Sequence, residues 1–299
     1  MKTHSHILEL ALPIEKTRMS VYLELTKPRI TLLVLITTLA GFYLGSLGSL
    51  NLLLLLHTLI GTALTAGGAS ALNMVLERDV DSRMRRTKNR PIPSGRLQCE
   101  EALLFGIILS ASGIFYLTVG VNLFTGLIAS LTLYCYLFLY TPLKRTTPFS
   151  TLIGAIPGAL PPVMGWSAAR GEISLGAWVL FSILFLWQLP HFLALAWLYR
   201  EDYARAGFPM LPVLDPDGER TGRHIALYCL ALIPVSLAPT LLGLAGPTYF
   251  FGALALGLVF FGFGLSFLIF KSKAFARRLF RTSVIYLPLL LILMMLNKI

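Results

Sequence analysis

The distribution of hydrophobic and polar positions along the chain shows long apolar runs separated by short polar connections. A helix needs about 20 apolar residues to cross the roughly 30 Å hydrocarbon core of a bilayer. Nine runs reach or approach this length, and they cover residues 30–50, 52–76, 101–120, 122–140, 149–168, 175–198, 224–245, 248–270 and 282–297. The pattern therefore predicts an all-α polytopic membrane protein with nine transmembrane helices.

The composition supports the membrane class. Hydrophobic residues make up 56% of the chain and charged residues only 13%, whereas a soluble domain carries about a quarter charged residues. Residues 1–26 lack the pattern of a secretory signal, because no apolar stretch precedes Pro13 and Glu15 interrupts the residues after it. We expect residues 1–26 to be a cytoplasmic lead-in, with an amphipathic surface helix as one form, and residues 27–299 to form a single membrane domain.

The net charge of +11 is explained by where the basic residues lie. All Lys and Arg residues except Arg170 and Lys298 fall in the N-terminal segment or in every second loop. The positive-inside rule then places the N-terminus and these loops in the cytoplasm and the C-terminus outside. Membrane topology accounts for the basicity, and no nucleic-acid partner is needed. The cysteines Cys99, Cys135 and Cys229 lack the paired spacing of a zinc site or a disulfide framework.

An acidic stripe stands at the end of the second apolar run. Asn73, Glu77 and Asp81 follow one another at helical spacing, which places them on one face of a helix. Two carboxylates one turn apart repel each other, and a divalent cation reverses the sign of that interaction. Oxygen ligands in this number, completed by water and substrate phosphates, suit Mg²⁺. Asp79 lies on the other side of the helix, and we expect it to point toward Arg83.

A run of cations comes directly after the stripe. Cations of this density can hold a polyanion through charge-assisted hydrogen bonds. The alternative is a solvated positive-inside loop with incidental ion pairs, but the combination of stripe and cations favours a metal–diphosphate site. The residues predicted to bind the diphosphate are Arg85, Arg86, Lys88 and Arg90, with Lys144 and Arg145 from the fourth loop.

Two further features belong to the sixth predicted helix. Glu201 and Asp202 lie just after its cytoplasmic end and are candidates for a second metal site facing the first. His191 lies inside the helix, roughly two to three turns before Asp202, and ionisable groups within a bilayer usually face the interior of a bundle. The alternative for His191 is a neutral packing histidine beside Pro190.

Four segments of the chain resemble the intramembrane, UbiA-type prenyltransferase superfamily typified by the 4-hydroxybenzoate polyprenyltransferases. The segments are TKPR at 26–29, NMVLERDVDSRMRRTKNRP at 73–91, YTPLKRTTPFSTLIGAIPGALPPVMGW at 140–166 and WQLPHFLALAWLYREDYARAGFPMLPV at 187–213. The WQ-x-PHF and DY-x-x-AG-x-PMLP patterns are similar to the heme-modifying branch, the protoheme IX farnesyltransferases.

The resemblance implies a bundle around a central cavity that opens near the cytoplasmic face of a bacterial inner membrane. In the family, two acidic motifs hold Mg²⁺, which binds farnesyl diphosphate. The first motif falls here on Asn73, Glu77 and Asp81, with Glu77 where the superfamily often has Asp. The second is usually two aspartates four residues apart, but Asp202 is followed at that spacing by Ala206. A second metal site would therefore use Glu201 or a single carboxylate.

The implied reaction transfers the farnesyl group to a vinyl group of protoheme IX (heme B), with addition of water, and yields heme O. Partners are then farnesyl diphosphate, heme B and the lipid bilayer, with heme A synthase or terminal oxidase assembly as further candidates. His191 would ligate the heme iron or orient the water. The implied catalytic residues are Asn73, Glu77, Asp81, Asp202 and His191, and the implied heme side is His191, Trp187 and Tyr203.

Two other functions remain as alternatives. A polyprenyltransferase that acts on an aromatic acid or quinone precursor would share the metal site and differ in the acceptor pocket. A secondary transporter would also explain many spans with polar residues, but transporters often show interrupted helices at the midplane in two repeated halves. Here the polar cluster stands at a helix end, and the sequence shows no clear halves.

Overall fold

The computed structural model describes residues 17–299, so most of the predicted N-terminal lead-in lies outside the described residues. Within them, nine membrane-length helical segments confirm the predicted number of spans. A short helix, α1 (Arg18–Leu25), precedes them. The spans are α2 (Pro28–Gly45), α3 (Leu52–Leu76), α5 (Cys99–Gly120), the fourth span (Leu123–Leu143), α8 (Ser150–Arg170), α9 (Leu175–Leu198), α12 (Glu219–Leu241), α13 (Pro247–Phe270) and α14 (Lys273–Leu296).

Two helix starts differ from the apolar runs by more than two residues. The helices α12 and α14 begin at Glu219 and Lys273, ahead of the predicted runs at 224 and 282. The added turns of α12 and α14 are rich in charged residues. Such turns can lie in the polar headgroup region, where a helix continues beyond the hydrocarbon core. The fourth span is composite and consists of α6 (Leu123–Tyr134), a π-helical turn η1 (Cys135–Tyr140) and α7 (Thr141–Leu143).

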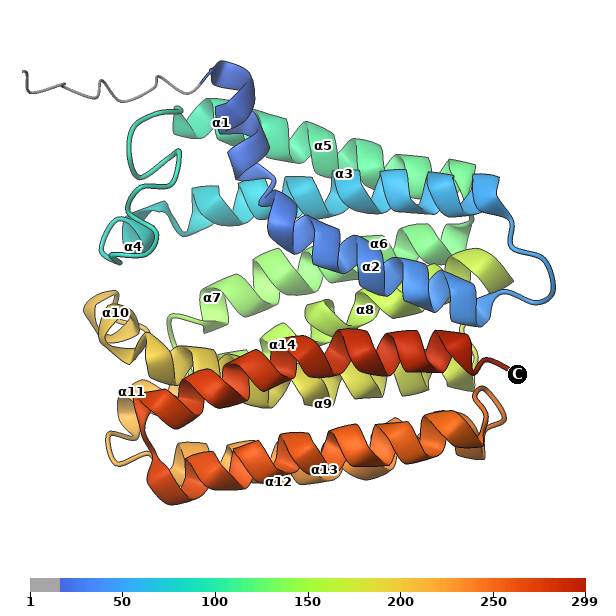
Figure 1. The fold of residues 1–299 in the computed structure, drawn as a ribbon. Helices are drawn as coiled ribbons and strands as arrows, with labels where there is room; N and C mark the ends of the chain where they lie inside the picture. Colours follow the sequence, from blue (N-terminus) through green and yellow to red (C-terminus); the bar gives the residue numbers. More distant parts are fainter. Residues whose placement is uncertain (1–16) are drawn as a thin grey trace, which may run out of the picture.

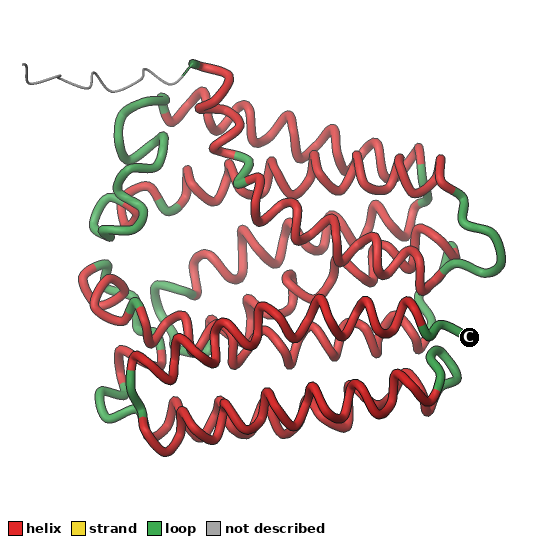
Figure 2. The backbone as a smooth tube through the Cα atoms, viewed as in Figure 1, coloured by secondary structure: helices red, strands yellow, loops and turns green. Residues whose placement is uncertain are grey.

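The spans run back and forth between two unlike ends of one bundle (Figure 1). We call the end on the left of Figure 1 the polar end, and it contains residues 77–98, 144–149, 199–218 and 271–272. It also carries the short helices α4 (Arg78–Asp81), α10 (Arg200–Arg205) and α11 (Leu211–Leu214). Figure 2 shows that the loops between the membrane-length helices lie at the two ends of the bundle. Both acidic segments are therefore at the same end.

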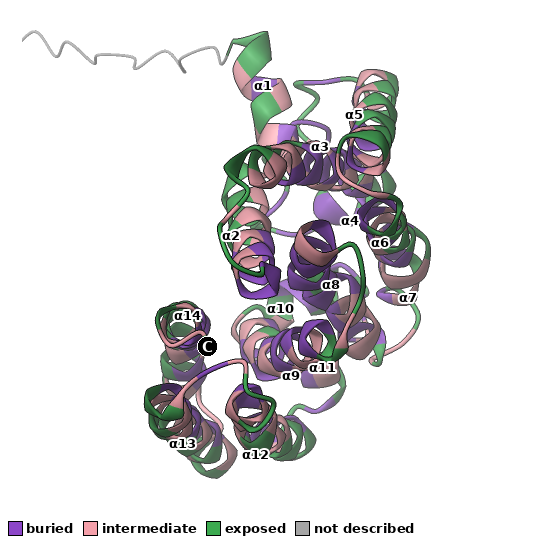
Figure 3. Cartoon of the chain, turned by 90° about the vertical axis from the view of Figure 1, so that its right-hand side faces the viewer, coloured by how far each residue is buried: buried purple, intermediate pink, exposed green. Residues whose placement is uncertain are grey.

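The helix α8 lies inside the bundle, and buried residues face it from its neighbours (Figure 3). Backbone contact holds it against α2. A Cβ on Gly41 would stand 2.0 Å from the Pro162 carbonyl oxygen, and one on Gly165 would stand 1.9 Å from the Thr38 carbonyl oxygen. Small residues allow such close approach in membrane helices.

The helix α3 packs on α5 in the same way. A Cβ on Gly68 would stand 2.2 Å from the Ser110 hydroxyl, and one on Gly113 would stand 2.6 Å from the Thr65 nitrogen. Glycine at these positions lets the two helices run in close contact toward the polar end. The acidic stripe is thus the continuation of a firmly packed helix.

The outer surface of the bundle carries large exposed apolar side chains, as expected for contact with lipid. Phe115 and Phe251 are examples, at 70% and 68% exposure. The chain is a multi-spanning membrane protein.

The two basic residues that depart from the charge pattern have a structural role at the opposite end. Arg170 Nε donates to the Gly45 carbonyl oxygen at 2.8 Å, and Lys298 Nζ donates to the carbonyl oxygens of Tyr43 and Ser46, each at 2.6 Å. These are among the last carbonyl groups of α2 and the residue after it, which lack partners within the helix and carry partial negative charge. Arg170 and Lys298 therefore cap the carboxyl end of α2.

Candidate functional site

The acidic stripe keeps its helical spacing through a break in the helix. The helix α3 ends at Leu76, yet the Glu77 amide donates to the Asn73 carbonyl at 2.9 Å and the Asp81 amide donates to the Glu77 carbonyl at 2.8 Å. Asn73, Glu77 and Asp81 are all buried, at 3%, 3% and 0% exposure. The three oxygen-bearing side chains therefore form one buried row that leads from the bundle to the polar end.

Each member of the stripe accepts a hydrogen bond from a different basic residue. The basic residues come from separate parts of the chain, namely the α1–α2 junction, the fourth loop and the loop after α4. The pairs are Lys27 Nζ with Asn73 Oδ1 at 2.8 Å, Lys144 Nζ with Glu77 Oε1 at 3.0 Å, and Arg90 Nη1 with Asp81 Oδ2 at 2.6 Å.

These surroundings shift the pKa values of two groups outside the spans. Burial alone would raise the pKa of Glu77, but the charge and hydrogen bond of Lys144 outweigh it and hold that pKa below its usual value. Burial, and next the positive charge of Arg90, lower the pKa of Lys27 to about 7. The lowered pKa keeps Glu77 ionised at neutral pH. A bound anionic ligand next to Lys27 would raise the pKa of that lysine.

The stripe fits a hard divalent cation. Asp81 Oδ1 is buried and has no hydrogen-bond partner among the described residues, which is a costly arrangement for a carboxylate oxygen unless a ligand completes it. No cluster of three or more His, Cys, Asp or Glu side chains with metal-binding geometry occurs in the described part of the chain. The stripe itself contributes two carboxylates and one amide, and an Mg²⁺ ion held there would need water and phosphate oxygens to complete its ligands.

The second acidic segment packs against the first through a small apolar cluster. Val80 and Met84, in and after α4, pack with Tyr203 of α10 and with Phe208. Asp202 is buried at 8% exposure and forms an ion pair with Arg205.

Glu201 does not join Asp202 at the stripe. Its side chain is 73% exposed and accepts a hydrogen bond from Lys273 at 2.8 Å. Neighbouring residues on a helix point about 100° apart, so one can be buried while the other faces outward. A metal role for Glu201 is not supported by this placement.

The predicted phosphate cations divide into three groups. Arg85, Arg86 and Lys88 are exposed on the loop, and Arg86 lies over the ring of Tyr199 at 5.2 Å and donates to the Tyr203 hydroxyl at 3.5 Å. Lys144 and Arg90 are the two of the predicted set that contact the stripe.

Arg145 is used differently. Its guanidinium donates to both Asp79 carboxylate oxygens, at 3.0 and 2.7 Å, and to the Leu76 carbonyl oxygen at 2.8 Å. The expectation that Asp79 points toward Arg83 is therefore wrong, because the fourth loop passes next to the end of α3. The paired guanidinium holds the pKa of Asp79 below its usual value.

His191 lies at the contact between α9 and α14. Its Nδ1 is 2.7 Å from the hydroxyl oxygen of Ser283. Its ring stacks on Trp187 with ring centres 5.1 Å apart and lies 4.7 Å from the ring centre of Phe280. Trp187 Nε1 donates to the Ser283 carbonyl oxygen at 2.8 Å. His191 and Trp187 thus form one cluster, whereas Tyr203 belongs to the cluster with Arg86.

Lys27 is a functional candidate to which the sequence analysis assigned no role. It adopts a left-handed backbone conformation, φ 47° and ψ 62°, directly before Pro28, a combination that is costly for a residue with a side chain. Such strain is often found at functional sites. The available signal was a lysine that lies between a surface helix and a proline at the start of a span. Its partner Asn73 is far away in the sequence, so local spacing does not reveal the contact.

Thr141 was also missed. Its hydroxyl accepts a hydrogen bond from Asn73 Nδ2 at 3.3 Å, so the π-helical turn η1 brings Thr141 and Lys144 to neighbouring members of the stripe. π-Helical turns of this kind are frequent at functional sites.

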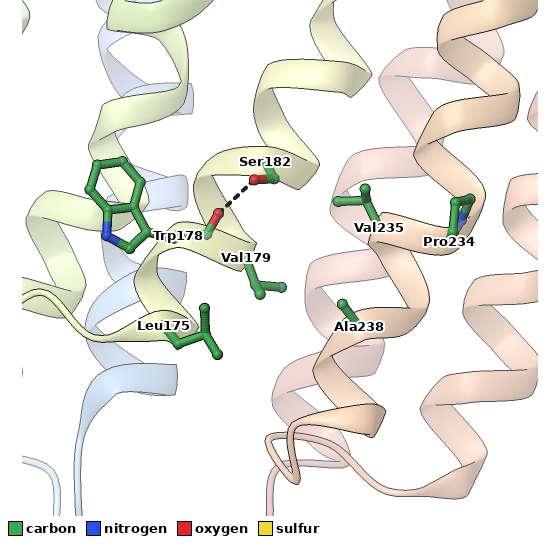
Figure 4. A pocket seen from close by; sticks show the side chains of 7 residues that line it. All are labelled: Leu175, Trp178, Val179, Ser182, Pro234, Val235 and Ala238. Carbon is green, nitrogen blue, oxygen red and sulfur yellow. Dashed lines mark hydrogen bonds between the residues drawn. The ribbon is translucent and has the colours of Figure 1, made fainter.

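A groove of about 330 Å³ on the bundle surface is lined by no charged side chain. Figure 4 shows that its one hydroxyl, on Ser182, is turned to the Trp178 carbonyl of its own helix. The groove lies between α9 and α12, in their halves toward the opposite end. Its lining residues are Leu175, Trp178, Val179, Ser182, Pro234, Val235 and Ala238.

Comparison with known sequences gives a consistent set of relatives. The sequence profile of the UbiA prenyltransferase family matches residues 34–290. A protoheme IX farnesyltransferase of Solibacter usitatus is 52% identical over 286 residues, which is 93% of this chain and 98% of the relative. A protoheme IX farnesyltransferase of Aquifex aeolicus is 44% identical over 270 residues, 90% of this chain and 92% of the relative.

Solved structures show the same fold at low identity. A digeranylgeranylglyceryl phosphate synthase superposes with a TM-score of 0.80 at 18% identity, covering 93% of this chain and 98% of the other. A UbiA homologue from Archaeoglobus fulgidus, bound to DMAPP and Mg²⁺, gives a TM-score of 0.66 at 17% identity, covering 91% and 98%.

Proposed function

The chain belongs to the UbiA prenyltransferase family, and from this premise we propose that it transfers a farnesyl group from farnesyl diphosphate to a vinyl group of heme B. Water is added in the same reaction, and the product is heme O. The support is the high identity to relatives named protoheme IX farnesyltransferase over nearly their whole length. The acceptor is thus inferred from sequence relatives, and the fold by itself would leave it open.

The observation that supports diphosphate binding is the buried Asp81 Oδ1, which has no hydrogen-bond partner among the described residues. It lies next to the basic residues that pair with the stripe. Asn73, Glu77 and Asp81 would hold Mg²⁺, which supplies charge to neutralise the diphosphate as the allylic C–O bond breaks. Lys27, Lys144 and Arg90 surround the same oxygens and stabilise the departing diphosphate through fixed positive charge. A single Mg²⁺ at the stripe is the arrangement we favour, because Glu201 points away.

The acceptor half rests on the cluster around His191. The rings of Trp187, His191 and Phe280 form an aromatic surface against which an apolar acceptor can pack. The enclosed bundle keeps water from the farnesyl cation until the heme vinyl group has attacked it. Water then adds to the cation on the heme side, and one proton leaves to yield the hydroxyl group.

The cellular setting is inferred from charge. We infer that the protein resides in a bacterial inner membrane with the polar end toward the cytoplasm, since nearly all basic residues lie at that end. Farnesyl diphosphate would enter from this side. Heme A synthase and terminal oxidase assembly are candidate recipients of the product.

The test is a competition between two acceptors. Purified protein receives farnesyl diphosphate and Mg²⁺ with heme B and 4-hydroxybenzoate together, and the products are separated by mass. We expect farnesylated heme only, lost with a chelator and restored by Mg²⁺. Prenylated 4-hydroxybenzoate without a heme product would instead establish the aromatic prenyltransferase, the nearest alternative.

A further inference from the structure

The hydrogen bonds around Ser283 determine which nitrogen of His191 carries the proton. The Ser283 side chain is fully buried, and its hydroxyl donates its single proton to the Phe280 carbonyl oxygen at 2.6 Å. The hydroxyl oxygen can then only accept from His191 Nδ1, which is 2.7 Å away. From this network we assign the proton to His191 Nδ1, which leaves the lone pair of the neutral ring on Nε2.

The ring around that lone pair is held in one orientation. Trp187 and Phe280 pack against His191 at 5.1 and 4.7 Å between ring centres. Trp187 is itself fixed by its hydrogen bond to the Ser283 backbone carbonyl at 2.8 Å. His191 Nε2 has no hydrogen-bond partner among the described residues.

We propose that Ser283 is a positioning residue that presents the Nε2 lone pair of His191 as a ligand to the iron of the heme acceptor. The inference rests on the proposed function, because it needs heme as the substrate. A histidine that ligates a metal through one nitrogen usually donates a hydrogen bond from the other, which fixes its tautomer and ring orientation. Ligation through Nε2 would hold the porphyrin beside the Trp187–His191–Phe280 cluster, with a vinyl group offered to the farnesyl carbon.

The chain offers a variant that removes only this bond and a matched control. Ser283→Ala deletes the hydroxyl but keeps the backbone carbonyl that binds Trp187. Thr282→Ala deletes a neighbouring hydroxyl that donates to the Arg278 carbonyl of its own helix at 3.0 Å. Ser283→Thr keeps a hydroxyl and tests whether the hydroxyl itself is needed.

The experiment titrates ferric heme B into detergent-purified protein and monitors the heme absorption spectrum, with farnesyl diphosphate binding measured in parallel. We expect a spectral shift typical of nitrogen ligation in the wild type and in Thr282→Ala. Ser283→Ala should weaken heme binding about tenfold or more, the usual effect of losing such a partner, and should leave farnesyl diphosphate affinity unchanged. Ser283→Thr should recover most of the heme affinity.

Two results would overturn the inference while leaving the proposed function intact. One is a wild-type protein that farnesylates heme without any ligation shift, which would exclude His191 as an iron ligand. The other is Ser283→Ala with wild-type heme affinity and spectrum. A wild-type protein that does not farnesylate heme at all would end the proposed function itself, and the competition of acceptors reports that separately.

Discussion

Replacing Asp81 by Asn tests the metal stripe and separates catalysis from folding. Asp81 is fully buried and its Oδ2 pairs with Arg90, whose side chain is 25% exposed. Breaking a fully buried ion pair costs about 3–5 kcal/mol, and an exposed pair is worth roughly 0–1 kcal/mol. Because Arg90 is partly exposed, we expect Asp81→Asn to lower the unfolding free energy by about 1–3 kcal/mol, between these limits.

The loss of activity should be larger than this destabilisation explains. Asp81→Asn removes one charged ligand and should reduce turnover by at least ~10²-fold, equivalent to about 2.7 kcal/mol of transition-state stabilisation. Arg90→Gln removes the same ion pair and keeps both carboxylate oxygens. It should leave Mn²⁺ binding in the absence of diphosphate as strong as in the wild type or stronger, since a competing cation is gone.

The double variant Asp81→Asn with Arg90→Gln makes the comparison decisive. Neither partner is then left charged and unpaired, so thermal stability should largely return. Turnover and Mn²⁺ binding, measured by electron paramagnetic resonance for the metal, should stay lost. If turnover returned with stability, Asp81 would act only by holding Arg90, and the metal assignment would fail.

Three further predictions concern other parts of the molecule. His191→Ala should abolish heme farnesylation and leave farnesyl diphosphate binding within about threefold, a split that marks an acceptor-side residue; normal heme product would make His191 a packing residue. Arg170→Met and Lys298→Met should each destabilise the protein by roughly 1–3 kcal/mol, since charged hydrogen bonds to α2 carbonyls are lost. In a thermal-challenge assay the turnover of the folded protein should be unchanged. Melting curves equal to that of the wild type would contradict the capping role. Reporter fusions after Arg145 should report the cytoplasm and fusions after Gly171 the opposite side, and a cytoplasmic signal at Gly171 would reject the topology.

The parts of the structure that were predicted correctly follow from local periodicity in the sequence. The spans were predicted from runs of apolar residues, and the stripe from the four-residue spacing of Asn73, Glu77 and Asp81. Both depend on helix geometry alone, which is visible within one segment. The starts of α12 and α14 were missed because charged residues fall within the first turns of both helices.

Contacts between distant segments were not accessible from the sequence. Lys27 and Asn73 are 46 residues apart, and His191 and Ser283 are 92 apart. A basic residue gives no sign of which anion it will meet, so Arg145 was assigned to phosphate and is found on Asp79. The separation of Glu201 from Asp202 likewise depended on how α10 packs, since both residues looked equally suitable as ligands.

Product analysis in heavy-oxygen water tests the central claim most directly. Wild-type protein is incubated with farnesyl diphosphate, Mg²⁺ and heme B in water labelled at oxygen, and the porphyrin product is measured by mass spectrometry. The account predicts heme that has gained one farnesyl group and one labelled hydroxyl group, because the cation formed on the former vinyl group is quenched by water. Farnesylated heme without labelled oxygen, or no heme product under these conditions, would contradict it.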